Sequence, residues 1–456
     1  MANKILIIGC GTAGAAATLM ARKTSRDASI TVLQDEAYPE YSRCGLPYAV
    51  SQKISKFDNL IIHSPNFYSS KLVGADLRLR TRATEVDAKN RTVQVEIDGG
   101  KTDSLSYDQL VLATGARPST PPIKGLDANH VFHLHTLDDA RNLQGAAKKG
   151  RKVAVIGAGL VGLETAEALH SMGLKITIIE FLDSVLPAML DSDMGELLIK
   201  KMEAEGITVK LGTAAKEVTK THVHAANRAT EKEEDVPADL VIVATGVRAN
   251  VKLATEAGLK IGKGGGILVD DKMRTSDAQI FAAGDCTEHL DLVTGQTIVS
   301  GLGSIALRQG EVAGINAAGG NAKLEGVVLA RTTHLFGMEI AGIGPTKFAA
   351  EKANLSILAS KFEGGVTAEY YPSNRHVSIK LLADKESGVL IGGQVIGPCA
   401  HQRVNVLSAA LASKMTIRQV ADLETCYAPP VAPIREPVTM AAQILALRYA
   451  RLKEKS

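Results

Sequence analysis

The sequence contains no tryptophan and only five cysteines in 456 residues, at positions 10, 44, 286, 399 and 426. These cysteines form no C-x-x-C pair and no metal-ligand spacing, and their odd number argues against a disulfide framework. No apolar run reaches the roughly 18 residues that a membrane-spanning helix requires. We therefore expect a cytoplasmic protein, in a reducing compartment, with no membrane span.

The sequence also lacks an excess of charge of one sign. Lysine and arginine number 52 and aspartate and glutamate 49, so no electrostatic argument favours binding to nucleic acid or to a membrane surface. The eleven histidines show no ligand spacing, and we expect no metal site. Hydrophobic residues make up 45% of the chain, an ordinary globular value, and the length predicts about two or three domains.

A glycine-rich pattern occurs twice. In each copy a short apolar strand runs into three glycines spaced G-x-G-x-x-G, then a helical stretch, then a second strand. The first copy has the strand Lys4–Ile8, a helix to about Lys23 and the strand Ile30–Leu33, with glycines at Gly9, Gly11 and Gly14. The second copy has the strand Lys152–Ile156, a helix to about Met172 and the strand Ile176–Glu180, with glycines at Gly157, Gly159 and Gly162. Two copies in this setting predict two dinucleotide-binding units.

A second internal repeat closes each unit. The strand that ends in Ala-Thr114-Gly115 resembles the later one that ends in Ala-Thr245-Gly246. Ile280–Asp285 resembles a late strand that returns to the first unit, so we expect the units to be nested. The predicted fold is α/β, with two nested Rossmann-like domains and a C-terminal α+β domain. We place these domains at 1–118 with 247–325, at 119–246, and at 326–456.

The C-terminal domain follows a different pattern. A β-hairpin is expected over Val377–Leu382 and Val389–Ile396, and a helix over Val404–Met415. The proline-rich stretch Tyr427–Pro437 predicts a fixed extended arm, and Met440–Lys455 a terminal helix.

The residue types at the two glycine-rich turns indicate the ligand chemistry. Glycines let the backbone approach a pyrophosphate, and the helix N-terminus favours its negative charge. Glu180 ends the strand after the second turn, where a carboxylate accepts hydrogen bonds from a ribose diol and repels a 2′-phosphate. This favours NADH over NADPH. In the first unit the corresponding position is Gln34, with Asp35 beside it.

Taken together, these motifs resemble the pyridine nucleotide–disulfide oxidoreductase family over essentially the whole chain. The resemblance implies FAD in the first unit, NAD(P)H in the second, and a C-terminal domain that forms a homodimer. Ala283-Gly284-Asp285 is similar to the family's second FAD motif, in which the aspartate contacts the ribityl chain. The implied FAD-binding residues are Gly9, Gly11, Gly14, Gln34, Asp35, Arg43, Thr114, Gly115 and Asp285. The implied NAD-binding residues are Gly157, Gly159, Gly162, Glu180 and Gly246.

Cys44 stands at the position of the family's redox centre, without the C-x-x-x-x-C pair that most members carry. A lone cysteine cannot close an internal disulfide, so it must form a mixed disulfide, a persulfide or a sulfenic acid with an external molecule. Arg43, where relatives usually have asparagine, could lower the pKa of Cys44 if its charge points toward the thiol. The alternative is that Cys44 is a small buried packing residue.

Within the family, Cys44-Gly-Leu-Pro-Tyr48 is most similar to the coenzyme A disulfide reductases and NADH-dependent persulfide reductases. Tyr427-Ala-Pro-Pro430 resembles the segment in which a tyrosine of the partner subunit reaches the redox cysteine. A second such tyrosine is Tyr370 or Tyr371, of which we take Tyr371 as the catalytic candidate. The candidate substrate-binding residues are Arg22 and Lys23 on the first helix, which would hold coenzyme A phosphates, and Arg403, which could equally be part of a helix start.

The leading hypothesis is an FAD- and NADH-dependent reductase of a small-molecule disulfide or persulfide, acting through Cys44 and a mixed disulfide. Coenzyme A disulfide, coenzyme A persulfide and polysulfide are the candidate substrates. The first alternative is an NADH oxidase or peroxidase in which Cys44 cycles through sulfenic acid. A flavin-binding redox sensor is a third hypothesis, which the intact Glu180 site disfavours because a sensor needs no hydride donor.

Overall fold

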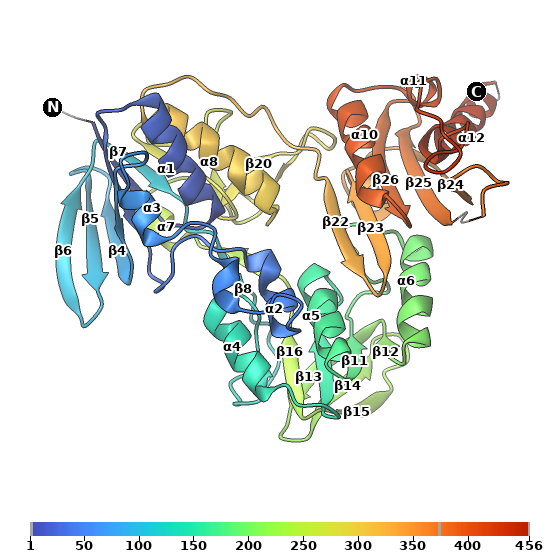
Figure 1. Cartoon of the computed structure of the whole chain (residues 1–456), viewed down its shortest axis with the longest axis horizontal. Helices are drawn as coiled ribbons and strands as arrows, with labels where there is room; N and C mark the ends of the chain where they lie inside the picture. Colours follow the sequence, from blue (N-terminus) through green and yellow to red (C-terminus); the bar gives the residue numbers. More distant parts are fainter. Residues whose placement is uncertain (1–2, 373–374, 455–456) are drawn as a thin grey trace.

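A computed structural model of the chain describes residues 3–372 and 375–454. Figure 1 shows three lobes, with the first unit at the left, the second below it and the C-terminal domain at the right. Among the described helices, none is both long and apolar enough to cross a membrane.

The first unit is built on a parallel sheet of order β19-β7-β1-β2-β3. Its strands are β1 (Lys4–Ile8), β2 (Ser29–Leu33), β3 (Ala75–Arg78), β7 (Gln109–Leu112) and β19 (Ile280–Ala282). Because β19 comes from far along the chain and pairs with β7, the second unit is inserted into the first. The predicted nesting is therefore confirmed.

Helices and a second sheet flank this first sheet. On one side the helices α1 (Thr12–Thr24) and α8 (Gly303–Ala317) pack closely against each other. Gly310 allows this contact, since a Cβ there would lie 2.2 Å from the Ala13 carbonyl oxygen. The remaining elements of this unit are α2 (Leu46–Val50), α3 (Pro65–Ser69), α7 (Lys252–Glu256), β4 (Thr81–Asp87), β5 (Thr92–Ile97), β6 (Lys101–Ser106), β18 (Ile267–Leu268), β20 (Thr287–Leu290) and β21 (Thr297–Ile298), with 3-10 turns at Arg43–Gly45 and Phe57–Leu60.

The second unit repeats this architecture with the sheet order β12-β11-β10-β16-β9. Its elements are β9 (Val131–Phe132), β10 (Lys152–Ile156), β11 (Lys175–Ile179), β12 (Thr208–Lys210), β16 (Leu240–Val243), α4 (Leu137–Ala146), α5 (Leu160–Ser171) and α6 (Ser192–Ala204), with a small sheet of β13 (Thr213–Val218), β14 (His222–Asn227) and β15 (Glu233–Pro237). Two antiparallel strands, β8 (Ala116–Pro118) and β17 (Val247–Ala249), join the two units. They fall where we predicted the first and second domain boundaries; the boundaries themselves remain a prediction.

The C-terminal domain is an antiparallel sheet of order β22-β23-β26-β25-β24 covered by helices. Its elements are β22 (Arg331–Leu335), β23 (Met338–Ile343), β24 (Ile357–Gly365), β25 (His376–Asp384), β26 (Leu390–Ile396), α9 (Lys347–Lys352), α10 (Ala400–Ala412), α11 (Ile417–Ala421) and α12 (Pro437–Lys453). The predicted hairpin is present as β25 and β26.

Two predicted helix boundaries were wrong. The helix predicted over Val404–Met415 begins four residues earlier and ends at Ala412, where Ser413 and the left-handed Lys414 (φ +51°) stop it. The terminal helix begins at Pro437, which we had assigned to the extended arm; Glu436 caps it by accepting a hydrogen bond from the Val438 N–H. Its predicted end, Lys455, lies outside the described residues.

Candidate functional site

The first glycine-rich turn leaves open space beside the N-terminus of α1. Gly9 adopts φ +101°, and a Cβ there would lie 2.2 Å from the Ala113 carbonyl oxygen. A Cβ on Gly14 would lie 1.8 Å from the Gly9 oxygen, whereas one on Gly11 would meet nothing within 4 Å. Two glycines are thus needed for close packing, and the third faces a cradle that suits a pyrophosphate.

The second turn has the same construction at the start of α5. A Cβ on Gly157 would lie 2.4 Å from the Ala244 oxygen and one on Gly162 would lie 2.1 Å from the Gly157 oxygen. A Cβ on Gly159 would again meet nothing within 4 Å. Gly246, with φ +103° and open space around it, ends the later Ala-Thr-Gly motif in the turn after β16. Both predicted dinucleotide cradles are therefore present as backbone shapes.

Gln34 and Glu180 occupy equivalent positions at the ends of β2 and β11. The Cys10 N–H donates to Oε1 of Gln34 at 2.9 Å, and the Ala158 N–H donates to Oε2 of Glu180 at 2.5 Å. Each side chain thus fixes the second residue of its glycine turn. A carboxylate oxygen can accept more than one hydrogen bond, so Glu180 retains capacity for a ribose diol. Asp35, beside Gln34, is exposed.

Asp285 follows β19 and lies in the first unit's cradle region. Burial raises the pKa of this carboxyl, while the charge of Arg43 opposes the shift. In the described part of the chain its side chain forms no hydrogen bond, so its oxygens can accept from hydroxyl groups of a ligand. The nearby Thr114 hydroxyl donates to the Asn250 carbonyl oxygen at 2.7 Å, and Gly115 has φ +63°. An open glycine turn with a free carboxylate beyond it fits FAD.

Arg43 does not act on Cys44 as we expected. Its guanidinium donates to Oε1 of Glu36 at 2.6 Å and to the His135 carbonyl oxygen at 2.5 Å. It also lies over the Tyr41 ring, 5.1 Å from the ring centroid. The charge is therefore directed to Glu36, and the condition under which it would lower the pKa of Cys44 is not met. Its predicted role in FAD binding stays a prediction.

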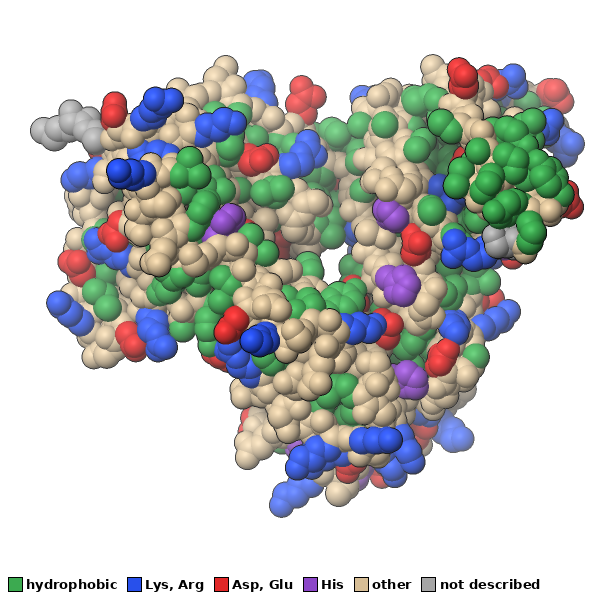
Figure 2. All heavy atoms as spheres, in the orientation of Figure 1, with side chains coloured by type: hydrophobic (Ala, Val, Ile, Leu, Met, Phe, Trp, Pro, Cys, Tyr) green, Lys and Arg blue, Asp and Glu red, His purple; other side chains and the backbone are tan. Residues whose placement is uncertain are grey.

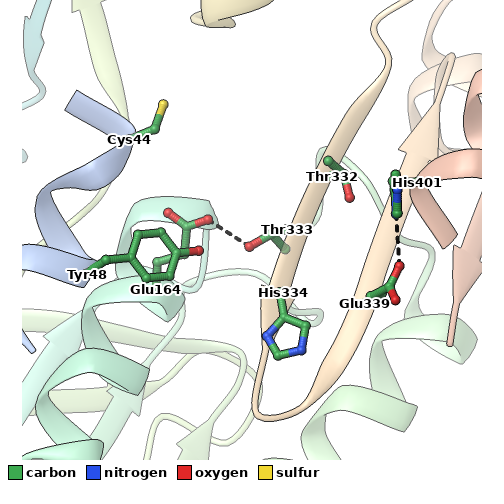
Figure 3. A pocket seen from close by; sticks show the side chains of 8 residues that line it. All are labelled: Cys44, Tyr48, Glu164, Thr332, Thr333, His334, Glu339 and His401. Carbon is green, nitrogen blue, oxygen red and sulfur yellow. Dashed lines mark hydrogen bonds and ion pairs between the residues drawn. The ribbon is translucent and has the colours of Figure 1, made fainter. Parts of the chain in front are cut away.

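Cys44 faces a pocket of about 360 Å³ where the three lobes meet (Figure 3). The thiol comes from the turn before α2, one wall comes from α5 of the second unit, and the opposite wall comes from the C-terminal domain. Cys44 is exposed to this space, so it is not the buried packing residue of the alternative hypothesis. The lining residues are Cys44, Tyr48, Glu164, Thr332, Thr333, His334, Glu339 and His401.

A carboxyl group dominates the electrostatics around the thiol. The Thr333 hydroxyl donates to Oε1 of Glu164 at 2.7 Å (Figure 3). Burial raises the pKa of Glu164, and this hydrogen bond opposes the shift. Burial also raises the pKa of Cys44, and the negative charges of Glu164 and Asp285 act in the same direction. The thiol is therefore held in its protonated form to a higher pH than an ordinary cysteine.

The sequence analysis did not identify several lining residues. Glu164 stands two residues after Gly162, at the start of the second turn of the helix that follows the glycines, and this spacing could have pointed to it. Thr333 and the hydrogen bond between His401 Nδ1 and Glu339 Oε2, 3.0 Å apart, carry no local sequence pattern. Strands β22 and β23 and helix α10 bring these residues to Cys44 only in the folded chain.

The other four cysteines lie outside this pocket. Cys10 and Cys286 are fully buried, and burial raises the pKa of Cys10 to about 11, as expected for packing residues. Cys399 and Cys426 are exposed. Cys44 is the only cysteine among the residues that line the pocket. In the described part of the chain no group of three His, Cys, Asp or Glu side chains could hold a metal ion.

Tyr370 and Tyr371, the two candidates for the second tyrosine, have different environments in the structure. The hydroxyl oxygens of Tyr370 and Tyr427 lie 3.0 Å apart, on side chains of residues that are 73% and 48% exposed. Tyr371 is half-buried, and within the described residues its one hydrogen bond joins its backbone N–H to the Ala368 carbonyl oxygen. None of the three lines the pocket of Cys44 in the same chain.

The predicted substrate-binding cations have other partners. All five guanidinium N–H groups of Arg22 donate to backbone carbonyl oxygens, including those of Val73 and Gly74. Arg403 forms an ion pair of 2.6 Å with Glu436 and donates to the Pro398 carbonyl oxygen. Lys23 is exposed beside Arg22. Their part in substrate binding stays a prediction.

Comparison with known proteins agrees with this construction. Residues 3–304 match the family described as pyridine nucleotide-disulphide oxidoreductase, and residues 331–438 match its dimerisation domain. The chain is 38% identical over 443 residues to a protein of Methanocaldococcus jannaschii named NADH oxidase, an alignment that covers 96% of this chain and 98% of the relative.

Two further similarities concern sulfur chemistry. The chain is 30% identical to a Pyrococcus horikoshii protein named NAD(P)H coenzyme A polysulfide/persulfide reductase, over 98% of this chain and 99% of the relative. The solved structure of an NAD-dependent persulfide reductase from A. fulgidus superposes with a TM-score of 0.93 at 37% identity, over 98% of this chain and 84% of the other. The nested cradles, the separate C-terminal domain and these matches together place the chain in the pyridine nucleotide–disulfide oxidoreductase family, a family of flavin-dependent enzymes that use NAD(P)H.

Proposed function

We propose that this protein is an FAD-dependent, NADH-consuming reductase of a small-molecule disulfide or persulfide, with Cys44 as the redox residue. The observation that supports it most directly is the single exposed thiol in a pocket that also contains Glu164 and Thr333 and no second cysteine. A thiol without an internal partner must exchange with a sulfur atom of the substrate.

In the proposed reaction, the Cys44 thiolate attacks one sulfur atom of R–S–S–R. A Cys44–S–S–R bond forms and RS⁻ leaves, taking a proton to become RSH. Bound FAD and NADH would supply the electron pair that cleaves this mixed disulfide, returning Cys44 to the thiolate and releasing the second RSH. The sum is R–S–S–R + NADH + H⁺ → 2 RSH + NAD⁺, and a persulfide R–S–S–H would give RSH and H₂S.

The residues present fit the two cofactors. The Gly9–Gly14 turn, Gln34 and the free carboxylate of Asp285 would hold FAD, and the Gly157–Gly162 turn with Glu180 would hold the dinucleotide donor. The buried negative charge of Glu180 supports NADH over NADPH, because a 2′-phosphate would meet it.

We further propose that the protein acts as a homodimer in the reducing cytoplasm. The matching dimerisation domain supports a dimer, and five unpaired cysteines suit a reducing compartment. Figure 2 shows hydrophobic side chains gathered on the outer edge of the C-terminal domain at the upper right. In the arm of the same domain, Val431 and Ile434 are 74% and 76% exposed, and Tyr427 is 48% exposed. A partner subunit would cover this surface and receive the tyrosines.

The relatives' names suggest coenzyme A persulfide, polysulfide or disulfide as the substrate class. The experiment is an anaerobic titration of the flavoprotein with NADH, followed by coenzyme A disulfide, coenzyme A persulfide and polysulfide in separate runs. We expect one of them to reoxidise the flavin rapidly, and Cys44→Ser to abolish this while FAD stays bound. Cys426→Ser, at an exposed cysteine outside the pocket, is the matched control. Full turnover in Cys44→Ser would overturn the proposal.

The second candidate is an NADH oxidase, which the M. jannaschii relative's name favours. Here Cys44 would cycle between thiolate and sulfenic acid, with peroxide or oxygen as oxidant. Flavin reoxidation by oxygen or peroxide alone, with no response to any disulfide or persulfide, would select it.

A further inference from the structure

A second pocket, of about 480 Å³, lies beside the two strands that join the dinucleotide-binding units. Its wall is formed by β8, β17, the glycine loop before β18 and the segment before α8. It contains none of the residues expected to hold FAD or NAD, and none of the residues that line the Cys44 pocket. Its volume falls in the range of small-molecule sites.

The lining of this pocket carries charge of only one sign. Arg117, Arg248 and Lys263 contribute three cationic side chains, and no aspartate or glutamate is among the lining residues. In the described part of the chain neither Arg248 nor Lys263 forms an ion pair or a side-chain hydrogen bond, and Arg117 donates only to the neutral amide oxygen of Asn250, at 3.0 Å. The cations of this pocket are therefore not neutralised within the chain.

The two arginines are placed against each other by the strand register. Arg248 pairs directly with Arg117 across the antiparallel strands β17 and β8. Like charges in directly opposite positions destabilise a strand pair, and within the described residues neither guanidinium group forms an ion pair with a carboxylate. An anion between the two guanidinium groups would remove this cost and gain charge-assisted hydrogen bonds.

The glycine loop makes room for a ligand on the third side. A Cβ on Gly265, which has φ +86°, would meet nothing within 4 Å. The loop is held by Glu288, whose buried carboxylate accepts from the Gly264 N–H at 2.9 Å. Glu288 thus uses its negative charge on the loop backbone, and it is not among the residues that line the pocket.

We propose that this pocket binds the diphosphate group of a ligand other than the two dinucleotides. Arginine guanidinium groups match pairs of phosphate oxygens bidentately, and Lys263 adds a third positive charge. Two linked phosphates carry at least two negative charges near neutral pH, so a diphosphate suits three cations better than a single carboxylate does. The diphosphate belongs either to a free nucleotide or to a nucleotide-bearing thiol substrate such as coenzyme A.

The test is calorimetric titration of the FAD-loaded protein, saturated with NAD⁺ so that both dinucleotide sites are filled, with inorganic pyrophosphate. We expect binding that weakens as the salt concentration rises, and at least tenfold weaker binding in Arg248→Ala/Lys263→Ala. Arg82→Ala/Lys89→Ala, on the β4–β5 hairpin and outside the residues that line the pocket, removes the same charge and should leave the affinity unchanged. Thermal midpoints of both variants show that they remain folded.

Absence of pyrophosphate binding to the parent protein, or equal affinities in the parent and Arg248→Ala/Lys263→Ala, would overturn the proposal. An equal loss in the control variant would do so as well, because the effect would then follow net charge. Parallel titrations with ADP and with coenzyme A distinguish the sources: tighter binding of ADP supports a free nucleotide, and tighter binding of coenzyme A supports the nucleotide end of a thiol substrate. Pyrophosphate binding to this pocket does not depend on whether Cys44 reduces disulfides, so the two proposals can fail separately.

Discussion

The hydroxyl of Thr333 on β22 donates a 2.7 Å hydrogen bond to the carboxyl of Glu164 on α5, which joins the C-terminal domain to the second dinucleotide-binding unit at the pocket of Cys44. The contact spans 169 residues of sequence. It sets a carboxyl group in the same pocket as the Cys44 thiol, where its charge opposes thiolate formation. The reactivity of Cys44 thus depends on how two domains meet.

Replacing Glu164 should make Cys44 more reactive at low pH. Burial, Glu164 and Asp285 raise the pKa of Cys44, so the thiolate fraction of the native enzyme grows only as the pH rises above the ordinary cysteine range. Glu164→Gln keeps the acceptor for Thr333 but removes one negative charge, and the pKa should fall. The measurement is the rate of iodoacetamide alkylation against pH, in a Cys399→Ser/Cys426→Ser background. A profile that stays in place or moves to higher pH would show that Glu164 does not act on the thiol.

Replacing the tyrosines one at a time by phenylalanine should show whether Tyr370 or Tyr371 acts together with Tyr427. The hydrogen bond with Tyr427 raises the pKa of Tyr370, as expected of a hydroxyl group whose proton is held in a hydrogen bond. If Tyr427 protonates the leaving thiolate, Tyr427→Phe should slow disulfide turnover by about a hundredfold, with FAD binding retained. Tyr370→Phe should cause a smaller loss and Tyr371→Phe none, measured by NADH oxidation with the best disulfide. A large loss in Tyr371→Phe alone would restore Tyr371 as the catalytic candidate.

Coenzyme preference should follow the charge of Glu180. Glu180→Gln keeps an oxygen that can accept from the Ala158 N–H, as Gln34 does for Cys10, but removes the charge that faces a 2′-phosphate. We expect the ratio of kcat/KM for NADH over that for NADPH to fall by about tenfold. Gln34→Glu, the converse change in the first unit, is the control and should leave this ratio unchanged. If Glu180→Gln retains the parent ratio, selectivity lies elsewhere in the site.

The contact between the second unit and the C-terminal domain should weaken when Lys380 is replaced. Lys380 Nζ lies 2.8 Å from Asp191 and 2.6 Å from Asp193, and the side chains of Lys380 and Asp191 are 11% and 8% exposed. Burial opposes the charge of Lys380, but the two carboxylates outweigh it and raise the pKa. Lys380→Met leaves Asp191 buried and unpaired, which costs about 3 kcal/mol or more.

The predicted result is a lower midpoint of thermal unfolding for Lys380→Met, followed by circular dichroism. Adding Asp191→Asn to this variant removes the uncompensated charge and should recover part of the loss. An unchanged midpoint in the single variant would mean that water or a rearranged side chain satisfies Asp191.

Much of the fold could be predicted because local patterns encode it. The strands Lys4–Ile8 and Lys152–Ile156 have the predicted bounds, and each glycine turn requires small residues at fixed offsets for steric reasons within the turn and the neighbouring strand. The repeat of that pattern, together with the late strand near Ile280, also indicated the nesting. Helix ends were less predictable, since the cap at Glu436 and the left-handed Lys414 are single-residue features.

The sequence by itself determined the two dinucleotide cradles and marked Cys44 as a thiol without an internal partner, because spacing along the chain is enough for both. Only the tertiary structure decided where the charges act. Arg43 lies next to Cys44 in sequence but binds Glu36 and a carbonyl oxygen 92 residues away, whereas Glu164 reaches the thiol's pocket from another domain. Backbone shape follows from neighbouring residues, but the direction of a long side chain follows from partners that the folded chain brings to it.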